Sequence, residues 1–145
     1  MIQSIDVSAV LRLAVRATYA DLVTRATGRA VREHIEQAYA ADAGFVARMD
    51  FTGVRCIDYS CADEIVAKLL RERIHVLVLR GCSDAHLEAL GPVLEGHGLA
   101  ALLERADGTL DGLGRPESTE ALLDELVARR LAARTAGGAV ALVAA

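Results

Sequence analysis

The N-terminal part of the chain changes from one hydrophobic pattern to another. Over residues 2–17, apolar residues first alternate with polar ones and then follow one another. This pattern predicts one or two short strands, or one strand preceded by irregular backbone. After Thr27, the apolar residues Val31, Ile35 and Tyr39 recur four positions apart. This spacing puts them on one face of a helix, and we expect Thr27 to be its N-cap.

Strands and helices alternate over the middle of the chain. Short apolar runs between turn-forming residues predict strands, and longer runs with helical spacing predict helices. The expected elements are, in order, a strand over 45–51 opened by Gly44, an apolar stretch over 54–57, a helix over 61–73, a strand over 74–79, a helix from Ser83 to Leu94 and a strand over 99–103. This alternation predicts an α/β fold in which helices pack against a mixed, mainly parallel sheet.

A stretch rich in glycine and turn formers, residues 107–116, predicts a boundary near the end of the chain. We therefore expect an α/β domain over residues 1–113, with its core at about 21–103, and a C-terminal appendage over 116–145. The expected elements of the appendage are a helix over 117–130 and a β-hairpin that turns at Gly137 and Gly138.

Composition and charge narrow the possible functions. The formal net charge of −4 opposes binding to a phosphate backbone, and aromatic residues make up only 3% of the chain, so we expect no nucleic-acid partner. The apolar stretches are interrupted before they reach the length of a membrane span, and the N-terminus lacks the pattern of a signal peptide. The three cysteines show no paired spacing, which favours a reducing, cytoplasmic location.

One segment has a pattern that belongs to a known family. Residues 45–70 read FVARMDFTGVRCIDYSCADEIVAKLL: an apolar strand with an aspartate near its end, a Gly-Val turn, an apolar stretch ending in Ile-Asp, and a small polar residue that opens a helix. This segment resembles the centre of a STAS domain (sulphate transporter and anti-sigma antagonist), most closely a divergent STAS-like group. The matching positions are Asp50, Gly53, Val54, Ile57, Asp58 and Ser60.

The resemblance implies a regulatory role rather than catalysis. In anti-sigma factor antagonists of this family, a partner kinase phosphorylates one of two neighbouring hydroxyl residues, and the phosphate breaks the complex. Those two positions fall here on Tyr59 and Ser60, and the glycine that follows them in the family falls on Cys61. The implied protein partner is a kinase-like ATPase or an anti-sigma factor. The candidate switch and partner-binding residues are Asp58, Tyr59, Ser60, Cys61, Asp63 and Glu64.

Three of these residues also have a simpler structural interpretation. Ser60 fits the role of N-cap for the helix that follows it. Asp63 and Glu64 lie in the first turn, where the helix dipole favours negative charge. Cys61, Cys82 and His86 are residue types that bind metals, but their spacing is not a known ligand signature. We expect no metal, no other cofactor and no enzymatic activity.

A second hypothesis concerns a different segment. The sequence TRATGR places Arg25 and Arg29 around a helix start at Thr27 and Gly28, where free amide groups and the dipole favour an anion. A small ligand or nucleotide sensor could use this site, although the segment lacks the glycine and lysine spacing of a P-loop. The sequence leaves the oligomeric state open.

Overall fold

The computed structural model describes residues 2–39 and 45–143, so the predicted role of Gly44 lies outside the described residues. The elements of the first half are β1 (Ile2–Asp6), α1 (Val7–Ala14), β2 (Asp21–Leu22), α2 (Arg25–Ala38), β3 (Val46–Asp50), β4 (Cys56–Ile57), α3 (Tyr59–Ala62), the π-helical turn η1 (Asp63–Ala67) and α4 (Lys68–Glu72). Those of the second half are β5 (Val76–Arg80), α5 (Asp84–Gly96), β6 (Ala100–Glu104), β7 (Leu110–Gly114), the 3-10 turn η2 (Pro116–Ser118), α6 (Thr119–Ala128), β8 (Ala132–Arg134) and β9 (Val140–Leu142).

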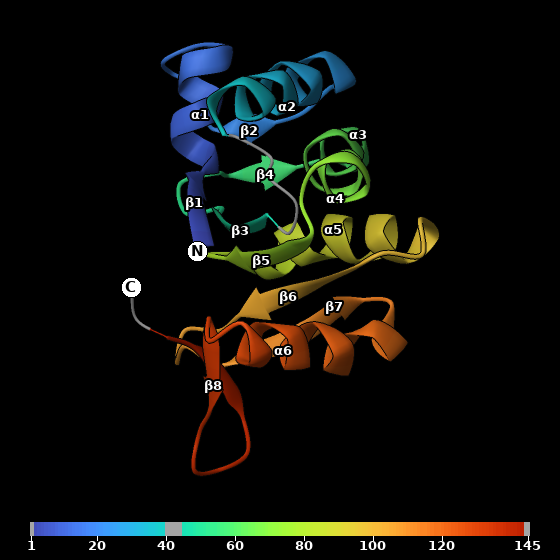
Figure 1. Ribbon diagram of the computed structural model, residues 1–145. Helices are drawn as coiled ribbons and strands as arrows, with labels where there is room; N and C mark the ends of the chain where they lie inside the picture. The colour runs from blue at the N-terminus through green and yellow to red at the C-terminus, as the bar shows by residue number, and fades with distance from the viewer. Residues whose placement is uncertain (1, 40–44, 144–145) are drawn as a thin grey trace.

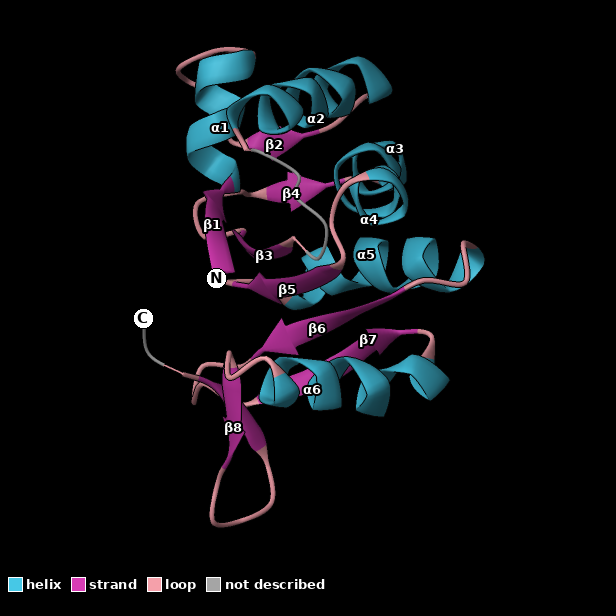
Figure 2. Cartoon of the chain, in the orientation of Figure 1, coloured by secondary structure: helices cyan, strands magenta, loops and turns pink. Residues whose placement is uncertain are grey.

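The main sheet has five strands in the order β1-β3-β5-β6-β7 (Figures 1 and 2). The first four strands are parallel, and β7 runs antiparallel to β6. Each successive parallel strand therefore lies further along the sheet in the same direction. Because the connections between these strands are right-handed crossovers, the helices in them lie on the same face of the sheet. The fold is α/β with a mixed, mainly parallel sheet, as the sequence predicts.

The two faces of the sheet bury separate apolar cores. Alternate residues such as Met49 and Leu79 face the larger core, which they share with α1, α2, the α3–α4 helix and α5. Val78 and Leu102, which point to the opposite face, belong to a smaller core with α6 and the β8–β9 hairpin. The C-terminal helix and hairpin therefore cover part of the second face, below the sheet in Figure 1.

Helix α1, strand β7 and the short strand β2 differ from the sequence prediction. The apolar run at the N-terminus forms β1 but then becomes helix α1, because Val7, Val10 and Leu11 have helical spacing and the Asp6 carboxylate accepts a hydrogen bond from the Ala9 amide at 3.1 Å. The glycine-rich stretch contains strand β7. Its glycines serve close packing, since a Cβ on Gly112 would lie 2.1 Å from Thr119 Oγ1.

The other predicted helices and the hairpin are confirmed with small changes in their bounds. Ser83 caps α5 as expected, within a capping box that it shares with His86. The hairpin forms from β8 and β9. Among the described residues, no helix has the length and apolar character that crossing a membrane requires.

Candidate functional site

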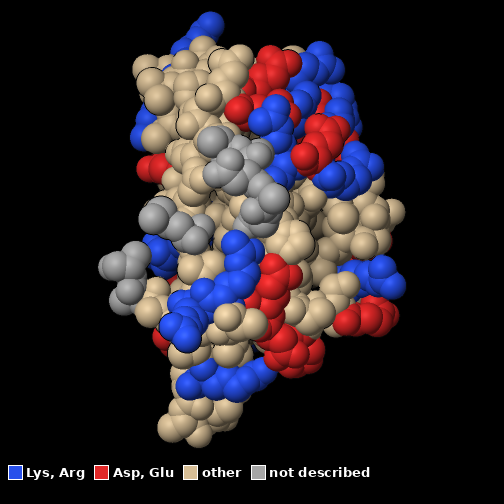
Figure 3. Space-filling model, in the orientation of Figure 1, with Lys and Arg blue, Asp and Glu red and all other residues tan. Residues whose placement is uncertain are grey.

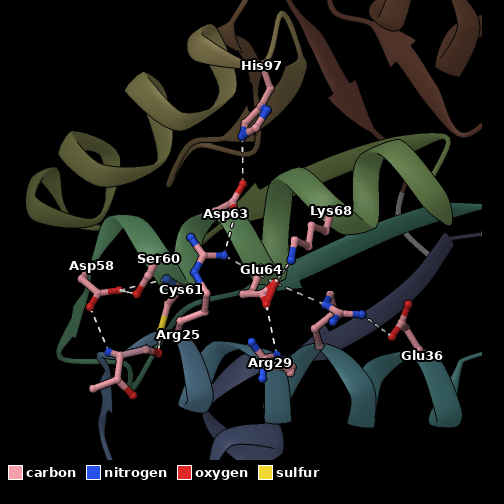
Figure 4. Close-up of polar contacts among 12 residues, drawn as sticks. Arg25, Arg29, Glu36, Asp58, Ser60, Cys61, Asp63, Glu64, Lys68 and His97 are labelled. Atoms are coloured by element: carbon pink, nitrogen blue, oxygen red, sulfur yellow. Dashed lines mark hydrogen bonds and ion pairs between the residues drawn. The ribbon is translucent and has the colours of Figure 1, made fainter.

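A short parallel strand pair places two helix starts side by side. Strand β2 pairs with β4 through Asp21 opposite Cys56 and Leu22 opposite Ile57. Helix α2 starts shortly after β2, and helix α3 starts shortly after β4. The candidate switch at the start of α3 therefore lies beside the candidate anion site at the start of α2 (Figure 4).

Gly28 lets these two helices approach closely. A Cβ at this position would lie 2.9 Å from the Cys61 Cα and 3.2 Å from the Glu64 Cβ. A contact of 2.9 Å with backbone leaves no room for a methyl group. Gly28 thus has a packing role, and its amide donates to the Thr24 carbonyl at 3.2 Å rather than pointing to open solvent.

Asp58 organises the start of α3. Its Oδ1 accepts hydrogen bonds from the Cys61 amide at 2.9 Å and from the Ser60 hydroxyl at 2.7 Å. Its Oδ2 accepts from the Thr24 amide at 2.9 Å. Burial acts to raise the pKa of Asp58, but these hydrogen bonds outweigh it and hold the pKa below the ordinary value of 3.8. The interpretation of Ser60 as the N-cap is wrong: Asp58 is the N-cap and Ser60 donates to it.

Thr24 joins the same network from the side of α2. Its backbone has φ 70° and ψ 145°, a region that is strained for a β-branched residue. The Thr24 carbonyl accepts from Cys61 Sγ at 3.1 Å, and its hydroxyl oxygen accepts from the Thr27 amide at 3.4 Å. Thr24 is therefore the N-cap of α2, and the prediction that Thr27 caps this helix is wrong.

The two candidate hydroxyl residues have different surroundings. The Tyr59 side chain is exposed at 61%, whereas Ser60 is half-buried and bonded to Asp58. A groove of about 260 Å³ adjoins Tyr59, between the start of α3 and α5. The residues that line it are Ile57, Asp58, Tyr59, Ala85, Glu88 and Ala89. The Tyr59 side chain is thus accessible to solvent, whereas the Ser60 hydroxyl is held at the helix start by Asp58.

The two acidic residues of η1, Asp63 and Glu64, contact different sets of side chains. The Asp63 carboxylate accepts from the Arg25 guanidinium at 2.8 Å and lies 2.8 Å from His97 Nε2. Burial acts to raise the pKa of Asp63, but hydrogen bonds from these two residues outweigh it and lower the pKa. Glu64 is fully buried, with four basic side chains within 4.0 Å of its carboxylate. They are Arg25, Arg29, Arg32 and Lys68.

The anion-site residues are therefore arranged differently from the prediction. The amides of Thr27 and Gly28 both bond to Thr24, and the guanidinium groups of Arg25 and Arg29 turn toward η1. A separate cavity of about 490 Å³ does lie against Thr24 and Thr27, but it is lined by Arg55 and by neither of those two arginines. Another cavity, of about 570 Å³, lies near Arg80 and Cys82 and is lined by none of the predicted switch or anion-site residues.

The residues considered as metal ligands, Cys61, Cys82 and His86, have surroundings that do not form a metal site. Burial, followed by the negative charge of Asp58, raises the pKa of Cys61 to about 12. Burial also raises the pKa of Cys82 to about 12. His86 Nδ1 accepts from the Ser83 amide at 3.0 Å, and its Nε2 lies 2.9 Å from the Val54 carbonyl oxygen. Within the described part of the chain, no group of three or more potential ligands could hold a metal ion.

Four residues of the site were not predicted from the sequence: Thr24, Arg32, Lys68 and His97. Lys68 follows Glu64 by four residues, and Arg32 follows Arg29 by three, so helical spacing alone could have put each of them beside a predicted residue. Thr24 lies in the TRATGR segment, but only the tertiary fold brings Thr24 to Asp58 and His97 to Asp63.

No family model, curated protein or solved structure matches this chain.

Proposed function

We propose that this protein is a non-enzymatic regulatory module that binds a protein partner reversibly through the start of α3, in the manner of an anti-sigma factor antagonist. The observation that carries the proposal is the pair of hydroxyl groups at this helix start: Tyr59 is exposed beside a groove, and Ser60 is bonded to the capping carboxylate of Asp58. The partner class, a kinase-like ATPase or an anti-sigma factor, follows from the STAS resemblance of residues 45–70.

A phosphate on Ser60 would act through the helix start itself. The modified residue loses the hydroxyl proton that Asp58 now accepts, and it gains a charge of about −1.5 to −2 next to that carboxylate. Repulsion would then weaken the contacts of Asp58 with Cys61 and Thr24. Phosphorylation of Ser60 would therefore loosen the junction between α2 and α3.

A phosphate on Tyr59 would act at the surface. The Tyr59 ring is largely exposed and takes no part in the cap of α3. The added charge would change the docking surface and leave the helix start intact. The two hydroxyl groups therefore suit two different switches, one that alters the fold locally and one that alters only the surface.

Capture of partners from the cells that produce the protein tests the proposal. Tagged wild-type protein is incubated with lysate and ATP, and mass spectrometry identifies both the bound proteins and any phosphate on Tyr59 or Ser60. Tyr59→Glu should lose the partner, whereas Tyr19→Glu, a change at another exposed tyrosine, should retain it. Equal recovery with both variants would contradict the proposed surface.

A further inference from the structure

The buried carboxylate of Glu64 lies among four positively charged side chains between α2 and α4. The Glu64 carboxylate lies 2.6 Å from Lys68 Nζ, 3.6 Å from Arg32 Nε, 3.7 Å from Arg29 Nε and 3.8 Å from Arg25 Nη1. Lys68 is within hydrogen-bond distance of Glu64 but outside regular hydrogen-bond geometry, and the three arginines lie too far away for hydrogen bonds, so they compensate the charge of Glu64 through electrostatic attraction. One negative charge therefore holds four positive groups close together.

Two neighbouring carboxylates neutralise part of this excess. Asp63 bonds to Arg25 at 2.8 Å, and Glu36 bonds to Arg32 at 2.7 Å. Arg73 also lies 3.8 Å from Glu36. These ion pairs join five cations to three carboxylates, so positive charge exceeds negative charge here in a chain whose net charge is −4.

Arg29 has the weakest attachment of the four cations around Glu64. Its contact with Glu64 is 3.7 Å long, and its guanidinium makes no hydrogen bond with any residue that the structure describes. The Arg29 side chain is 55% exposed, and that of Arg25, one helical turn earlier, is 46% exposed. Both guanidinium groups thus have donors available on the solvent side of α2, where Figure 3 shows basic and acidic side chains close together.

We propose that Arg25, Arg29 and Lys68 bind a dianionic phosphoryl group on the outer surface of α2 and α4. Guanidinium groups match the oxygens of a phosphate with paired hydrogen bonds, and two of them one helical turn apart can contact the same phosphate. Glu64 keeps the three cations within one small region, but as a carboxylate it also competes with an incoming anion for them.

The phosphoryl group can be carried by a phosphorylated peptide or by a nucleotide, since both present the same chemistry. The inference goes beyond the proposed function and is tested on the protein alone. Its success or failure is therefore independent of whether a partner binds the start of α3.

The test is a nuclear magnetic resonance titration that follows the arginine Nε–H signals. The probes are inorganic phosphate, ATP, and a short peptide with and without one phosphoserine. We expect the signals of Arg25 and Arg29 to shift with at least one phosphorylated probe and not with the unmodified peptide. Stronger binding of the phosphopeptide would identify a protein segment as the ligand source, and stronger binding of ATP would identify a nucleotide.

Two variants decide whether these arginines form the site. Arg29→Gln should weaken binding by about tenfold, the effect of losing charge-assisted hydrogen bonds, while Arg115→Gln, at another exposed arginine, should leave it unchanged. Unchanged affinity in Arg29→Gln, or absence of any shift with all three phosphorylated probes, would overturn the proposal.

The Glu64→Gln variant should change phosphate affinity in the opposite direction from Arg29→Gln. The amide keeps the shape of the side chain but removes the charge that competes for the cations, so phosphate binding should become tighter. Circular dichroism first establishes that this variant is folded. Weaker binding by a folded Glu64→Gln protein would contradict the idea that Glu64 competes with the bound anion. If this variant does not fold, the Arg29→Gln result alone decides the proposal.

Discussion

Asp58 connects the starts of α2 and α3 through one carboxylate. It accepts hydrogen bonds from Ser60, Cys61 and Thr24. The sequence pattern drew attention to Asp58, but it predicted Ser60 as the N-cap. Aspartate and serine are comparable N-caps. Only the extended backbone of Asp58, with φ −97° and ψ 173°, distinguishes them, and this conformation is not visible in the sequence.

Replacing Asp58 should therefore destabilise the protein in a pH-dependent way. Asp58→Ala should lower the free energy of unfolding by about 1–2 kcal/mol at neutral pH, because a capping carboxylate is lost. The pKa of Asp58 is lower in the folded state than its ordinary value of 3.8. Its stabilisation is thus present above about pH 4 and disappears as the pH falls through the lowered folded-state pKa.

Urea unfolding at neutral pH and at about pH 3 measures this effect. The difference between wild type and Asp58→Ala should be smaller at the acidic pH. Asp6→Ala is a matched control, since Asp6 caps α1 through one contact with the Ala9 amide, and its effect should be smaller at neutral pH. An Asp58→Ala protein as stable as wild type at neutral pH would show that the cap is unimportant.

The cysteines should react slowly with thiol reagents. Burial raises the pKa of Cys61 and of Cys82 to about 12, so both are protonated thiols at neutral pH. Cys61 is also fully buried, whereas Cys56 is half-buried. Ellman's reagent should label Cys56 first and Cys61 last in the folded protein. Rapid labelling of Cys61 without unfolding would be inconsistent with this structure.

At the scale of elements, periodicity predicted the helices and strands that have a clear apolar face. Strand β3, helices α2 and α5, and the C-terminal hairpin were all expected from the pattern. Strand β7 was not, because close packing and turns both select glycine, and the sequence does not separate the two causes. The contact between α2 and α3 could not be predicted either, since Gly28 was interpreted as part of an anion site.

Gly28 and Gly91 provide a matched pair of helical glycines. Gly28→Ala should destabilise the protein by about 1–3 kcal/mol, because its Cβ would meet the Cys61 Cα at 2.9 Å. Gly91→Ala should be neutral or stabilising by up to about 1 kcal/mol, since its Cβ would meet only Leu113 Cδ1 at 3.7 Å and alanine is the better helix former. Thermal unfolding of both variants measures the difference. Equal effects would show that α2 and α3 do not approach so closely.

At the scale of the whole molecule, the two faces of the sheet are covered by different parts of the chain. The crossover helices cover one face, and α6 with the hairpin covers part of the other. The sequence predicted the C-terminal elements but could not show which surface they cover. Since Leu126 packs in the same cluster as Val78 and Leu102, the C-terminal segment shares a core with the sheet.

This shared core predicts that the chain unfolds as one unit. Leu126→Ala should lower the free energy of unfolding by about 2–5 kcal/mol, because Leu126 is fully buried. Circular dichroism and the chemical shifts of residues in both cores should report a single transition with the same midpoint. Separate transitions for the sheet and for residues 116–145 would contradict the shared core.

The central claim is that the start of α3 is the surface that binds a protein partner. The most direct test is the affinity of the captured partner for three purified proteins: wild type, Tyr59→Glu and Tyr19→Glu. We predict that Tyr59→Glu weakens binding by about tenfold or more while Tyr19→Glu binds like wild type, with all three unfolding at similar temperatures. Equal affinity of Tyr59→Glu and wild type would show that the partner binds elsewhere and would contradict the proposed function.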